Sequence, residues 1–520
     1  IVSGPIRNLD RSGHNLSHSN MFTGTTGTLI PVLCEELLPH DTVSLGAQFQ
    51  VQLPPMVTDF YGKVDFVLEA FFVPNRLCFG GWSEFITHPT LNPQYPEGTP
   101  VAAKPTRVPY FNVSGGSILD FPSDSLPNYL DYGDQYVGQD GAANDLSVLP
   151  LVAYHRIWDD WYRDSRIQAP LFYKAQLGSP SPSSILSSLP YESVGVSGAP
   201  ITLTSGVAFA DGVQLTSLRQ RNWVKDYFTT CSTLPQAGSG SEVKFDVDSV
   251  NNTGAFSIAT LRAANSLQKW MERNNIAGYR YSDQIYAQFG IYPSDAIMDR
   301  PLYLGRSVTT VYNRSVFGTV NNEGTDLAQK AASSQVIGEN SLVDSFTASE
   351  HGFLMVLASL VPRPVYGSGS ERRNFRTKVS DFAFPLLAGM GDQAVLKREL
   401  TGRSQDRDTF GYTDLYAEYK FRNDKVHGKL REDEDLSKFV LQRYFGLSAD
   451  VNLGSEFLLI PKDFLDQVQA VDTSTSGYTY WAEIYFPFRK LSTIPAYSQP
   501  TLADLKNAHT EYISRGGKRL

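Results

Sequence analysis

The sequence predicts a mainly β fold in which many short strands are joined by long, ordered loops. Aromatic residues make up 12% of the 520-residue chain, and its 41 Gly and 30 Pro residues are spread along the whole length. Aromatic side chains suit pleated sheets, whereas Gly and Pro supply turns. Strong strand patterns lie near both ends of the chain. If the two ends pair in shared sheets, the middle is inserted between them, which is the wiring of a Greek-key sandwich.

The first group of strands is expected between residues 27 and 75. Apolar residues recur with a period near two in Gly27 to Leu33 and in Val43 to Leu53, which indicates strands with one buried face. Phe66 to Val73 is a nearly uninterrupted apolar run that stops at Pro74. We therefore expect this third strand to be covered on both faces, near the centre of a sheet.

The second group of strands is expected between residues 350 and 490. Gly352 to Val361 is an apolar run ended by Pro362, and apolar residues alternate with more polar ones in Tyr478 to Phe488. The strands should therefore concentrate in 27–75 and 350–490.

Two helical patterns lie between these groups. Near 154–166, apolar residues fall at helical spacing, and the same spacing returns within 257–289. Gly278 should interrupt the second pattern, so that a short further helix runs from Ser282 to Phe289. The apolar residues of the two patterns are Tyr154, Ile157, Trp158, Trp161, Leu261, Ala264, Leu267, Trp270 and Met271.

Three segments are expected to be long inserted loops. Residues 92–150 and 178–215 are rich in Pro, Gly, Ser and Asp, and residues 320–350 are polar and small. Each is too long for a plain connection in a compact domain, so we expect it to serve function or subunit contact.

Charge, cysteine usage and hydropathy narrow the class of protein. A formal net charge of −9 excludes a chain that coats nucleic acid over its whole surface, so any such contact must be local. The three Cys residues are far apart and form no C-x-x-C pair, which predicts neither a disulfide framework nor a thiolate metal site. No run of about 18 apolar residues and no signal-peptide pattern is present, so we expect a soluble chain made in a reducing interior.

One segment has the residue types that bind unpaired nucleic acid. Cations and rings alternate at period two and would share one face of an extended segment, where rings stack on bases and cations meet phosphates. The alternative is that the two rings are core residues flanked by solvated charges. The segment consists of Arg219, Arg221, Trp223, Lys225 and Tyr227.

A second candidate for nucleic-acid contact is the basic tail with Arg515, Lys518 and Arg519. A flexible basic tail reaches phosphates without a preformed pocket, and the alternative is a solvated chain end.

Patterns that would indicate catalysis or metal binding are weak. Asp159 and Asp160 are adjacent, so on a helix they diverge by about 100° and cannot flank one glycosidic bond. His14 and His18 lie four apart, but no Glu follows His14 as in a zinc helix. No P-loop, dinucleotide fingerprint or nucleophile elbow occurs. We therefore predict no catalytic residue, no cofactor and no metal.

Several segments resemble a known family and occur in its order along nearly the whole chain. They include SHSNMFTGTTGTLIPVLCEELLPHDTVSL at 17–45, FFVPNRL at 71–77, AYHRIWDDWYRD at 153–164, WVKDYFTTCSTLPQAG at 223–238, LRAANSLQKWMERNNIAGYRYSDQIYAQFGI at 261–291 and FGYTDLYAEYKF at 410–421. Together they resemble the major capsid protein of microviruses, most closely the gokushovirus-like branch.

The resemblance implies more than periodicity does. It implies one domain over residues 1–520, an eight-stranded antiparallel jelly roll with long inserted loops and a few short helices. It also implies self-assembly into a T=1 icosahedral shell around circular single-stranded DNA. The implied partners are further copies of the chain, the packaged DNA, a small basic DNA-binding virion protein and other minor virion proteins. The chain would be made in the bacterial cytoplasm and end in the virion.

A rival interpretation remains from composition alone. The aromatic content and the long loops are also typical of a secreted or surface β-sandwich that binds carbohydrate or hydrolyses glycosides. The chain lacks a signal peptide, paired Cys and a convincing carboxylate pair, all of which weigh against that class.

Overall fold

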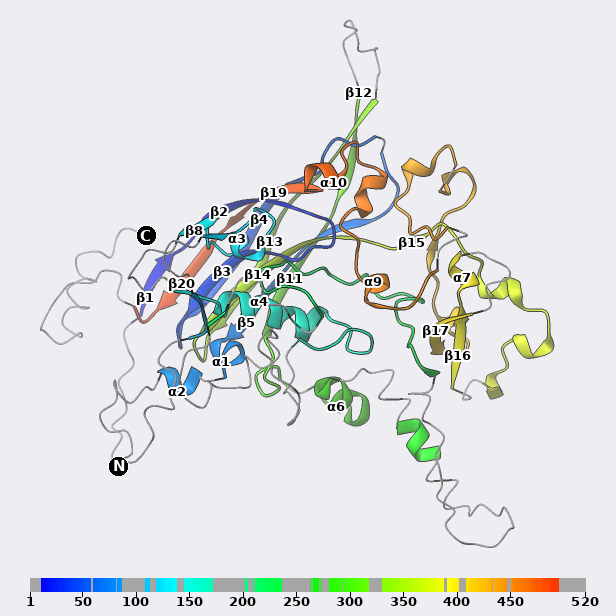
Figure 1. Ribbon diagram of the computed structural model, residues 1–520, viewed down its shortest axis with the longest axis horizontal. Coiled ribbons are helices and arrows are strands. Elements are labelled where there is room, and N and C mark those ends of the chain that lie inside the picture. The colour runs from blue at the N-terminus through cyan, green and yellow to red at the C-terminus, as the bar shows by residue number, and fades with distance from the viewer. Residues whose placement is uncertain are drawn as a thin grey trace, which may run out of the picture.

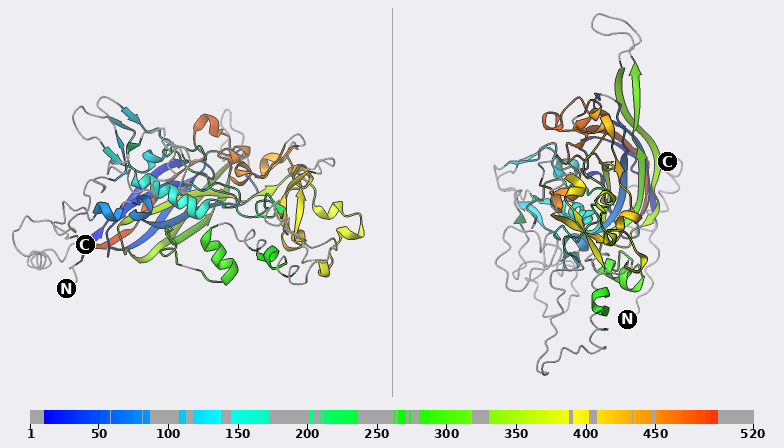
Figure 2. Two further views of the ribbon diagram at one scale, coloured as in Figure 1. Left: turned by 60° about the horizontal axis from the view of Figure 1, so that its bottom comes forward. Right: turned by 90° about the vertical axis from the view of Figure 1, so that its right-hand side faces the viewer.

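The computed structural model describes residues 11–494 with gaps, of which the longest are 87–107, 172–201, 236–261 and 318–329. Two facing β-sheets lie at its centre (Figures 1 and 2). The larger contains β1 (Ser12–Asn15), β2 (His18–Gly24), β4 (Thr42–Gln52), β12 (Tyr312–Phe317), β13 (Lys330–Thr347), β19 (Tyr480–Phe486) and β20 (Phe488–Ser492). The smaller contains β3 (Ile30–Leu37), β5 (Val64–Pro74), β11 (Leu302–Thr310) and β14 (Gly352–Pro362).

Strands from the two ends of the chain pair in a nested series. β2 pairs with β19, β3 with β14, β4 with β13 and β5 with β11, and all four pairs are antiparallel. The strands β2, β3, β4 and β5 alternate between the larger and the smaller sheet. This is the wiring of a jelly roll, so the predicted fold class is confirmed.

The number of strand segments differs from the expected eight. The two sheets contain eleven segments, seven in one and four in the other, among the described residues. β1 and β2 follow each other along β20 and β19, and Pro487 separates the latter two strands. Proline has no N–H for a strand ladder, which explains the interruption. β12 pairs with only one end of β13.

The main core lies between the two sheets. Phe49 of β4 and Phe66 of β5 face each other with ring centroids 5.2 Å apart, and Tyr480 of β19 meets Phe66 at 6.2 Å. β5 is buried along its whole length because its other face, with Phe71 and Val73, belongs to a second core. It lies between β11 and β14, as its uninterrupted apolar run predicts.

Helices cover the outer face of the smaller sheet. α1 (Asn75–Cys78), α4 (Leu149–Ile157) and the π-helical turn η2 (Trp158–Tyr162) contribute to the second core. The helix expected near 154–166 therefore begins earlier and ends earlier, because Pro150 fits the first turn of α4 and Arg163 is already extended. Within 257–289, α6 (Tyr281–Phe289) ends at Gly290, and much of the remainder lies outside the described residues.

The prediction that residues 320–350 form a loop is wrong for most of the segment. Residues 330–347 form β13, the strand that pairs with β4 on one side and β12 on the other. β13 contains many polar residues because one face of an antiparallel sheet can be solvated while the other packs on the core. Val336 and Val343 are buried, whereas Ile337 and Asp344 are exposed.

The other two expected loops carry short elements where they are described. Within 92–150 lie β6 (Tyr110–Asn112), β7 (Ile118–Asp120), α3 (Leu126–Tyr129), β8 (Gln135–Val137) and β9 (Asp145–Ser147). Phe111 and Leu126 insert into the second core, which gives this segment order that polar composition does not reveal. Most of 178–215 lies outside the described residues, and β10 (Thr202–Leu203) pairs with β6.

A side lobe occupies the connection between β14 and β19, at the right of Figure 1. Only the two ends of the interval 350–490 therefore supply strands to the sandwich. The lobe has its own small core, which includes Tyr227, Phe228 and Phe410. Among the described residues, no helix is long and apolar enough to cross a membrane.

The lobe and its border are built of short elements. They are β15 (Val365–Tyr366), η5 (Arg372–Phe375), η6 (Val379–Asp381), η7 (Pro385–Leu387), β16 (Asp392–Leu396), α7 (Arg398–Thr401), β17 (Thr409–Asp414), α8 (Ala417–Lys420), β18 (Asp424–Lys425), η8 (Gly428–Leu430), η9 (Ser437–Phe439), α9 (Ser455–Leu458), η10 (Phe464–Gln467) and α10 (Thr473–Ser476). α2 (Trp82–Ile86) lies apart from them, after α1.

Candidate functional site

The segment expected to contact nucleic acid is extended but runs through the interior. The N–H of Arg221 donates to the carbonyl of Gly27, and the N–H of Trp223 donates to that of Leu458. Gly27 has a φ of 70°, and a Cβ there would lie 2.5 Å from the Cβ of Ile460. The segment therefore joins the sandwich to the lobe at a close backbone contact.

Arg219 is buried, and protein groups accept hydrogen bonds from its Nε and Nη1. Its Nε donates to Nδ1 of His155 at 3.0 Å, and its guanidinium pairs with Asp211. The same group lies 4.8 Å from the ring centre of Trp158. Burial lowers the pKa of Arg219, although Asp211 opposes that shift. Burial, followed by the charge of Arg219, lowers the pKa of His155 well below its usual value.

Arg221 forms the second internal ion pair. Its Nη1 donates to Oε2 of Glu69 at 2.8 Å, and its guanidinium lies 5.1 Å from the ring centre of Tyr162. Tyr162 donates its hydroxyl hydrogen to the same carboxylate, and Arg306 lies 3.3 Å from it. A buried carboxylate needs such partners, because an unpaired one is strongly destabilising.

The two rings of the segment also serve packing. Trp223 is buried against Phe464, with ring centroids 4.9 Å apart, and under the guanidinium of Arg443. Tyr227 is buried and donates its hydroxyl hydrogen to Glu399 at 3.2 Å. Lys225, in contrast, is exposed.

The five residues predicted to contact DNA therefore do not share one exposed face. Arg219, Arg221, Trp223 and Tyr227 point into the protein, which agrees with the alternative of a packed segment, and only Lys225 offers its charge to solvent. Ion pairs and packing within the subunit already occupy these four side chains, although Tyr227 also lines a pocket. The basic tail with Arg515, Lys518 and Arg519 lies outside the described residues.

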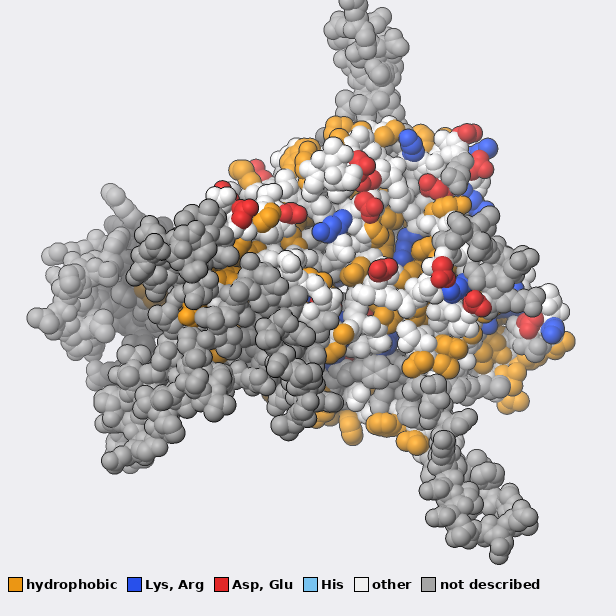
Figure 3. Space-filling view, in the orientation of Figure 1, with side chains coloured by type: hydrophobic (Ala, Val, Ile, Leu, Met, Phe, Trp, Pro, Cys, Tyr) orange, Lys and Arg blue, Asp and Glu red, His pale blue; other side chains and the backbone are white. Residues whose placement is uncertain are grey.

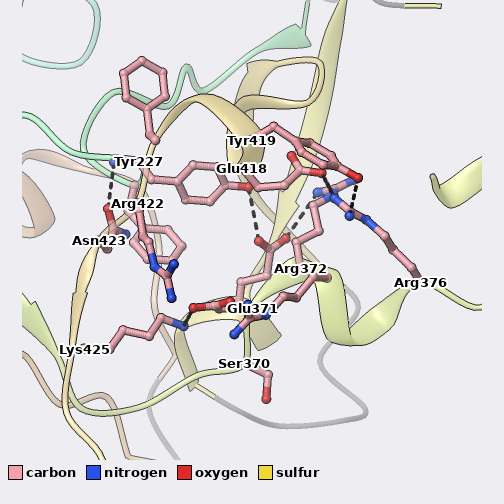
Figure 4. A pocket seen from close by; sticks show the side chains of 14 residues that line it. Tyr227, Ser370, Glu371, Arg372, Arg376, Glu418, Tyr419, Arg422, Asn423 and Lys425 are labelled. Atoms are coloured by element: carbon pink, nitrogen blue, oxygen red, sulfur yellow. Dashed lines mark hydrogen bonds and ion pairs between the residues drawn. The ribbon is translucent and has the colours of Figure 1, made fainter. Parts of the chain in front are cut away.

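A pocket with many cations opens in the lobe beside Tyr227 (Figure 4). Its volume is about 270 Å³. The lining combines five cations, three carboxylates and four rings: Arg372, Arg373, Arg376, Arg422, Lys425, Glu371, Glu399, Glu418, Tyr227, Phe228, Tyr419 and Phe421, with Ser370 and Asn423.

Ion pairs fix most of the charges in this pocket. Nη1 of Arg372 lies 3.3 Å from Oε1 of Glu399, and Nη2 of Arg376 lies 2.5 Å from Oε1 of Glu418. Burial raises the pKa of Glu399. Burial also acts to raise the pKa of Glu418, but hydrogen bonds from Gln393, its own backbone N–H and Arg376 outweigh it, so that pKa is lowered.

Arg422 differs from the other cations of the pocket. It is exposed, and none of the carboxylates in the described part of the chain forms an ion pair with it. Tyr419 and Phe421, which also line the pocket, are 58% and 59% exposed, and the guanidinium of Arg376 lies 4.5 Å from the ring centre of Tyr419. A guanidinium without an ion pair among the described residues, in a pocket that also exposes rings, can bind a phosphate while a base stacks nearby.

Sequence reasoning missed this pocket. Residues 371–378 and 420–425 read ERRNFRTK and KFRNDK, so the same mixture of cations and rings was present in both. A search for segments that combine cations with rings would have found both parts of the pocket. Only the fold shows that the two segments meet at Tyr227.

Two exposed apolar patches provide a different kind of surface. The helix patch, on and after α6, consists of Tyr281, Tyr286, Phe289, Ile291, Tyr292 and Ile297. The lobe patch, on and between η6 and η7, consists of Val379, Phe382, Phe384, Leu386 and Leu387. Orange side chains gather at the lower edge and the right edge of Figure 3, where α6 and the lobe lie in Figure 1. Such patches mark interaction surfaces.

The described residues offer little for catalysis or metal binding. Asp159 pairs with Arg163 at 2.6 Å and Asp160 with Arg156 at 2.9 Å, so both carboxylates hold their own helical turn together. Within the described ranges, no group of three His, Cys, Asp or Glu side chains could hold a metal ion.

Comparison with known proteins gives one consistent result. A family model described as "Capsid protein (F protein)" matches residues 5–249 and 187–502. The chain is 25% identical to capsid protein VP1 of Chlamydia phage 1, with 96% of each chain covered. It is 22% identical to capsid protein VP1 of Bdellovibrio phage phiMH2K, with 86% of this chain and 88% of that protein covered. Capsid protein VP1 of Spiroplasma virus 4 is 28% identical over 49% of this chain and 47% of that protein.

Proposed function

From the premise that this chain belongs to the phage capsid protein (F protein) family, we propose that its copies close into a T=1 icosahedral shell around circular single-stranded DNA. The chain is a structural subunit of the virion and not an enzyme. The rival carbohydrate-active class has no support in the comparisons.

The nested pairing of the strands is the observation that carries the proposal. Because strands from the two ends of the chain pair with each other, the long connections from β5 to β11 and from β14 to β19 are inserted between strands of the sandwich. The sandwich then acts as a rigid wedge, and the connections meet the neighbours. In a ring of identical subunits, such contacts join two different surfaces and must close by rotation.

The genome needs only local contacts with this chain. A net charge of −9 leaves most phosphate neutralisation to another component, which we propose is a small basic virion protein made in the same bacterial cell. Within this chain, Lys225 and the tail with Arg515, Lys518 and Arg519 remain candidates. We add Arg422 and the exposed rings of the pocket in Figure 4, because Arg422 has no ion pair among the described residues and the rings offer stacking surfaces.

Electron microscopy of the purified full-length chain tests the shell. Closed, uniform particles support the proposal, and a chain that stays monomeric under all assembly conditions contradicts it. Nuclease treatment of the particles, followed by extraction, tests the cargo. Circular single-stranded DNA that survives in closed particles is expected, whereas particles that protect only RNA or duplex DNA contradict that part.

A further inference from the structure

We propose that the larger sheet binds a pyranose ring of an uncharged carbohydrate in a groove on its outer face. This sugar groove lies where β2, β19 and β4 are neighbours, and α3, beside β2 in Figure 1, forms one of its rims. Its volume is about 690 Å³. Small-molecule sites commonly have about 300–1,000 Å³. Such a site goes beyond the formation of a shell and does not depend on it.

The pairing of the strands places the central side chains of the sugar groove side by side. Trp481 lies opposite Thr23 of β2 on one side and opposite Gln52 of β4 on the other. Two positions further along β19, Glu483 lies opposite Gln50. Directly opposed residues of antiparallel strands bring their Cβ atoms to about 4.5–5.5 Å. A single sugar ring over Trp481 is therefore within reach of polar groups from three strands.

Trp481 supplies an apolar surface in a groove that is otherwise mainly polar. It is 38% exposed, and its ring N–H donates to Oε1 of Gln52 at 3.0 Å, which fixes the position of the ring. The face of an aromatic ring carries partial negative charge, so it attracts the weakly positive C–H groups on one face of a pyranose. Contact with these C–H groups also removes the exposed ring from water.

The polar side chains around this ring suit hydroxyl groups. A sugar hydroxyl both donates and accepts hydrogen bonds, and the amides of Gln50 and Asn128 each carry a donor and an acceptor. The carboxylates of Asp131 and Glu483 accept from hydroxyls. Within the described part of the chain, none of these four side chains has a hydrogen-bond or ion-pair partner. Their polar groups are therefore available to a ligand.

The charges of the sugar groove exclude ligands that carry phosphate. None of the described residues that line it is Lys, Arg or His, whereas Asp131 and Glu483 bring two negative charges. A phosphate needs a positive site, so a nucleotide or single-stranded DNA does not fit. The pocket of the lobe is the opposite case, with five cations and three carboxylates. An uncharged ligand with many hydroxyls fits the groove best.

Hydrogen bonds hold the walls of the sugar groove in place. The hydroxyl of Tyr129 on α3 donates to the carbonyl of Thr23 at 2.8 Å, which ties the rim to β2. Nδ2 of Asn20 on β2 donates to the carbonyl of Val32 on β3 at 2.7 Å. A groove that is ordered in advance loses less entropy when it binds a ligand. One stacked ring with a few hydrogen bonds should give a dissociation constant of about 1 mM or weaker.

Saturation-transfer NMR of the purified full-length chain tests the sugar groove. The probes are the methyl glycosides of glucose, galactose, mannose and N-acetylglucosamine, each at up to about 50 mM because binding is weak. One variant is Trp481→Ala, and a second combines Gln50→Ala with Asn128→Ala. Trp270→Ala is the matched control, because Trp270 is 50% exposed and lies outside the groove.

We expect transfer from the wild-type chain to the C–H groups of at least one probe. Trp481→Ala should weaken binding about three- to tenfold, because the stacking surface is lost. The double amide variant should weaken it by a similar factor, and Trp270→Ala should leave it unchanged. Because the ligand is uncharged, binding should be the same at low and at high salt.

Two results would overturn the sugar groove. The first is the absence of transfer to all four probes, and the second is transfer that Trp481→Ala leaves unchanged. Circular dichroism shows whether each variant is folded, and the double amide variant decides if Trp481→Ala does not fold. A single-stranded oligonucleotide or a Lys-rich peptide that displaces the probe at low salt but not at high salt would overturn the ligand class. Closed shells that bind none of the probes would refute the groove and leave the proposed function intact.

Discussion

The sandwich and the side lobe are stabilised by different kinds of interaction. The core between the two sheets contains 40 buried apolar residues, whereas the described core of the lobe contains 11. The lobe compensates with ion pairs such as Arg372 with Glu399 and Arg376 with Glu418. It also exposes apolar side chains that the sandwich would bury. The difference indicates that the sandwich supplies stability and the lobe supplies contact surfaces.

Among the changes considered, one in the centre of the sandwich should lower the free energy of unfolding the most. Phe66 is fully buried and touches aromatic rings from the opposite sheet. Phe66→Ala should lower the free energy of unfolding by about 3–5 kcal/mol, because it removes buried surface and leaves a cavity. Denaturant unfolding of the subunit measures the loss. The control Met21→Ala, at an exposed position, should change it by less than about 0.5 kcal/mol.

The second prediction concerns the junction between sandwich and lobe. Arg221→Met should cost about 3 kcal/mol, because Glu69 keeps its charge in a buried place and loses its closest cation. Adding Glu69→Gln to the same chain should restore part of that loss. The same unfolding assay measures both chains. A double variant that is less stable than the single variant would contradict the internal ion pair.

The third prediction is a pH dependence that arises at the same junction. The pKa of His155 in the folded subunit lies below its unfolded value, so the unfolded chain binds more protons below about pH 6.5. Stability should therefore fall as the pH falls below that value, by up to about 1.4 kcal/mol per pH unit from this group. His155→Gln should flatten the profile between pH 6.5 and 5 relative to wild type. His427→Gln, at an exposed position, should not.

The smallest expected effect lies in the pocket of the lobe. Arg422→Ala removes an exposed charge without an ion-pair partner among the described residues, so unfolding should change by less than about 0.5 kcal/mol. Binding of a single-stranded oligonucleotide should weaken, with the salt dependence reduced by about one phosphate contact. Fluorescence anisotropy at several salt concentrations measures this. If Lys462→Ala has an equal effect, binding is nonspecific and the pocket has no special role.

The two regions also differ in how far sequence patterns predict them. Strands of the sandwich were predictable where apolar residues alternate or run without interruption, as in β4 and β5. β13 was missed because one of its faces is solvated and its residues are small and polar. The jelly-roll wiring followed from the resemblance, because periodicity does not say which strands pair.

The candidate site was less predictable for a physical reason. The spacing of Arg219, Arg221, Trp223 and Tyr227 places them on an extended segment, but it does not reveal which neighbours cover that segment. The carboxylate that pairs with Arg221 lies 152 residues away in the chain, and the one bound by Tyr227 lies 172 residues away. The pocket of the lobe could not be predicted for the same reason, since its cations come from two segments about 50 residues apart in the chain.

The most direct test of the account is an electron-microscopic reconstruction of particles formed by the full-length chain. The account predicts a closed T=1 shell whose neighbouring subunits are related by rotation. A chain that remains monomeric, or particles that do not close into a shell, would contradict it.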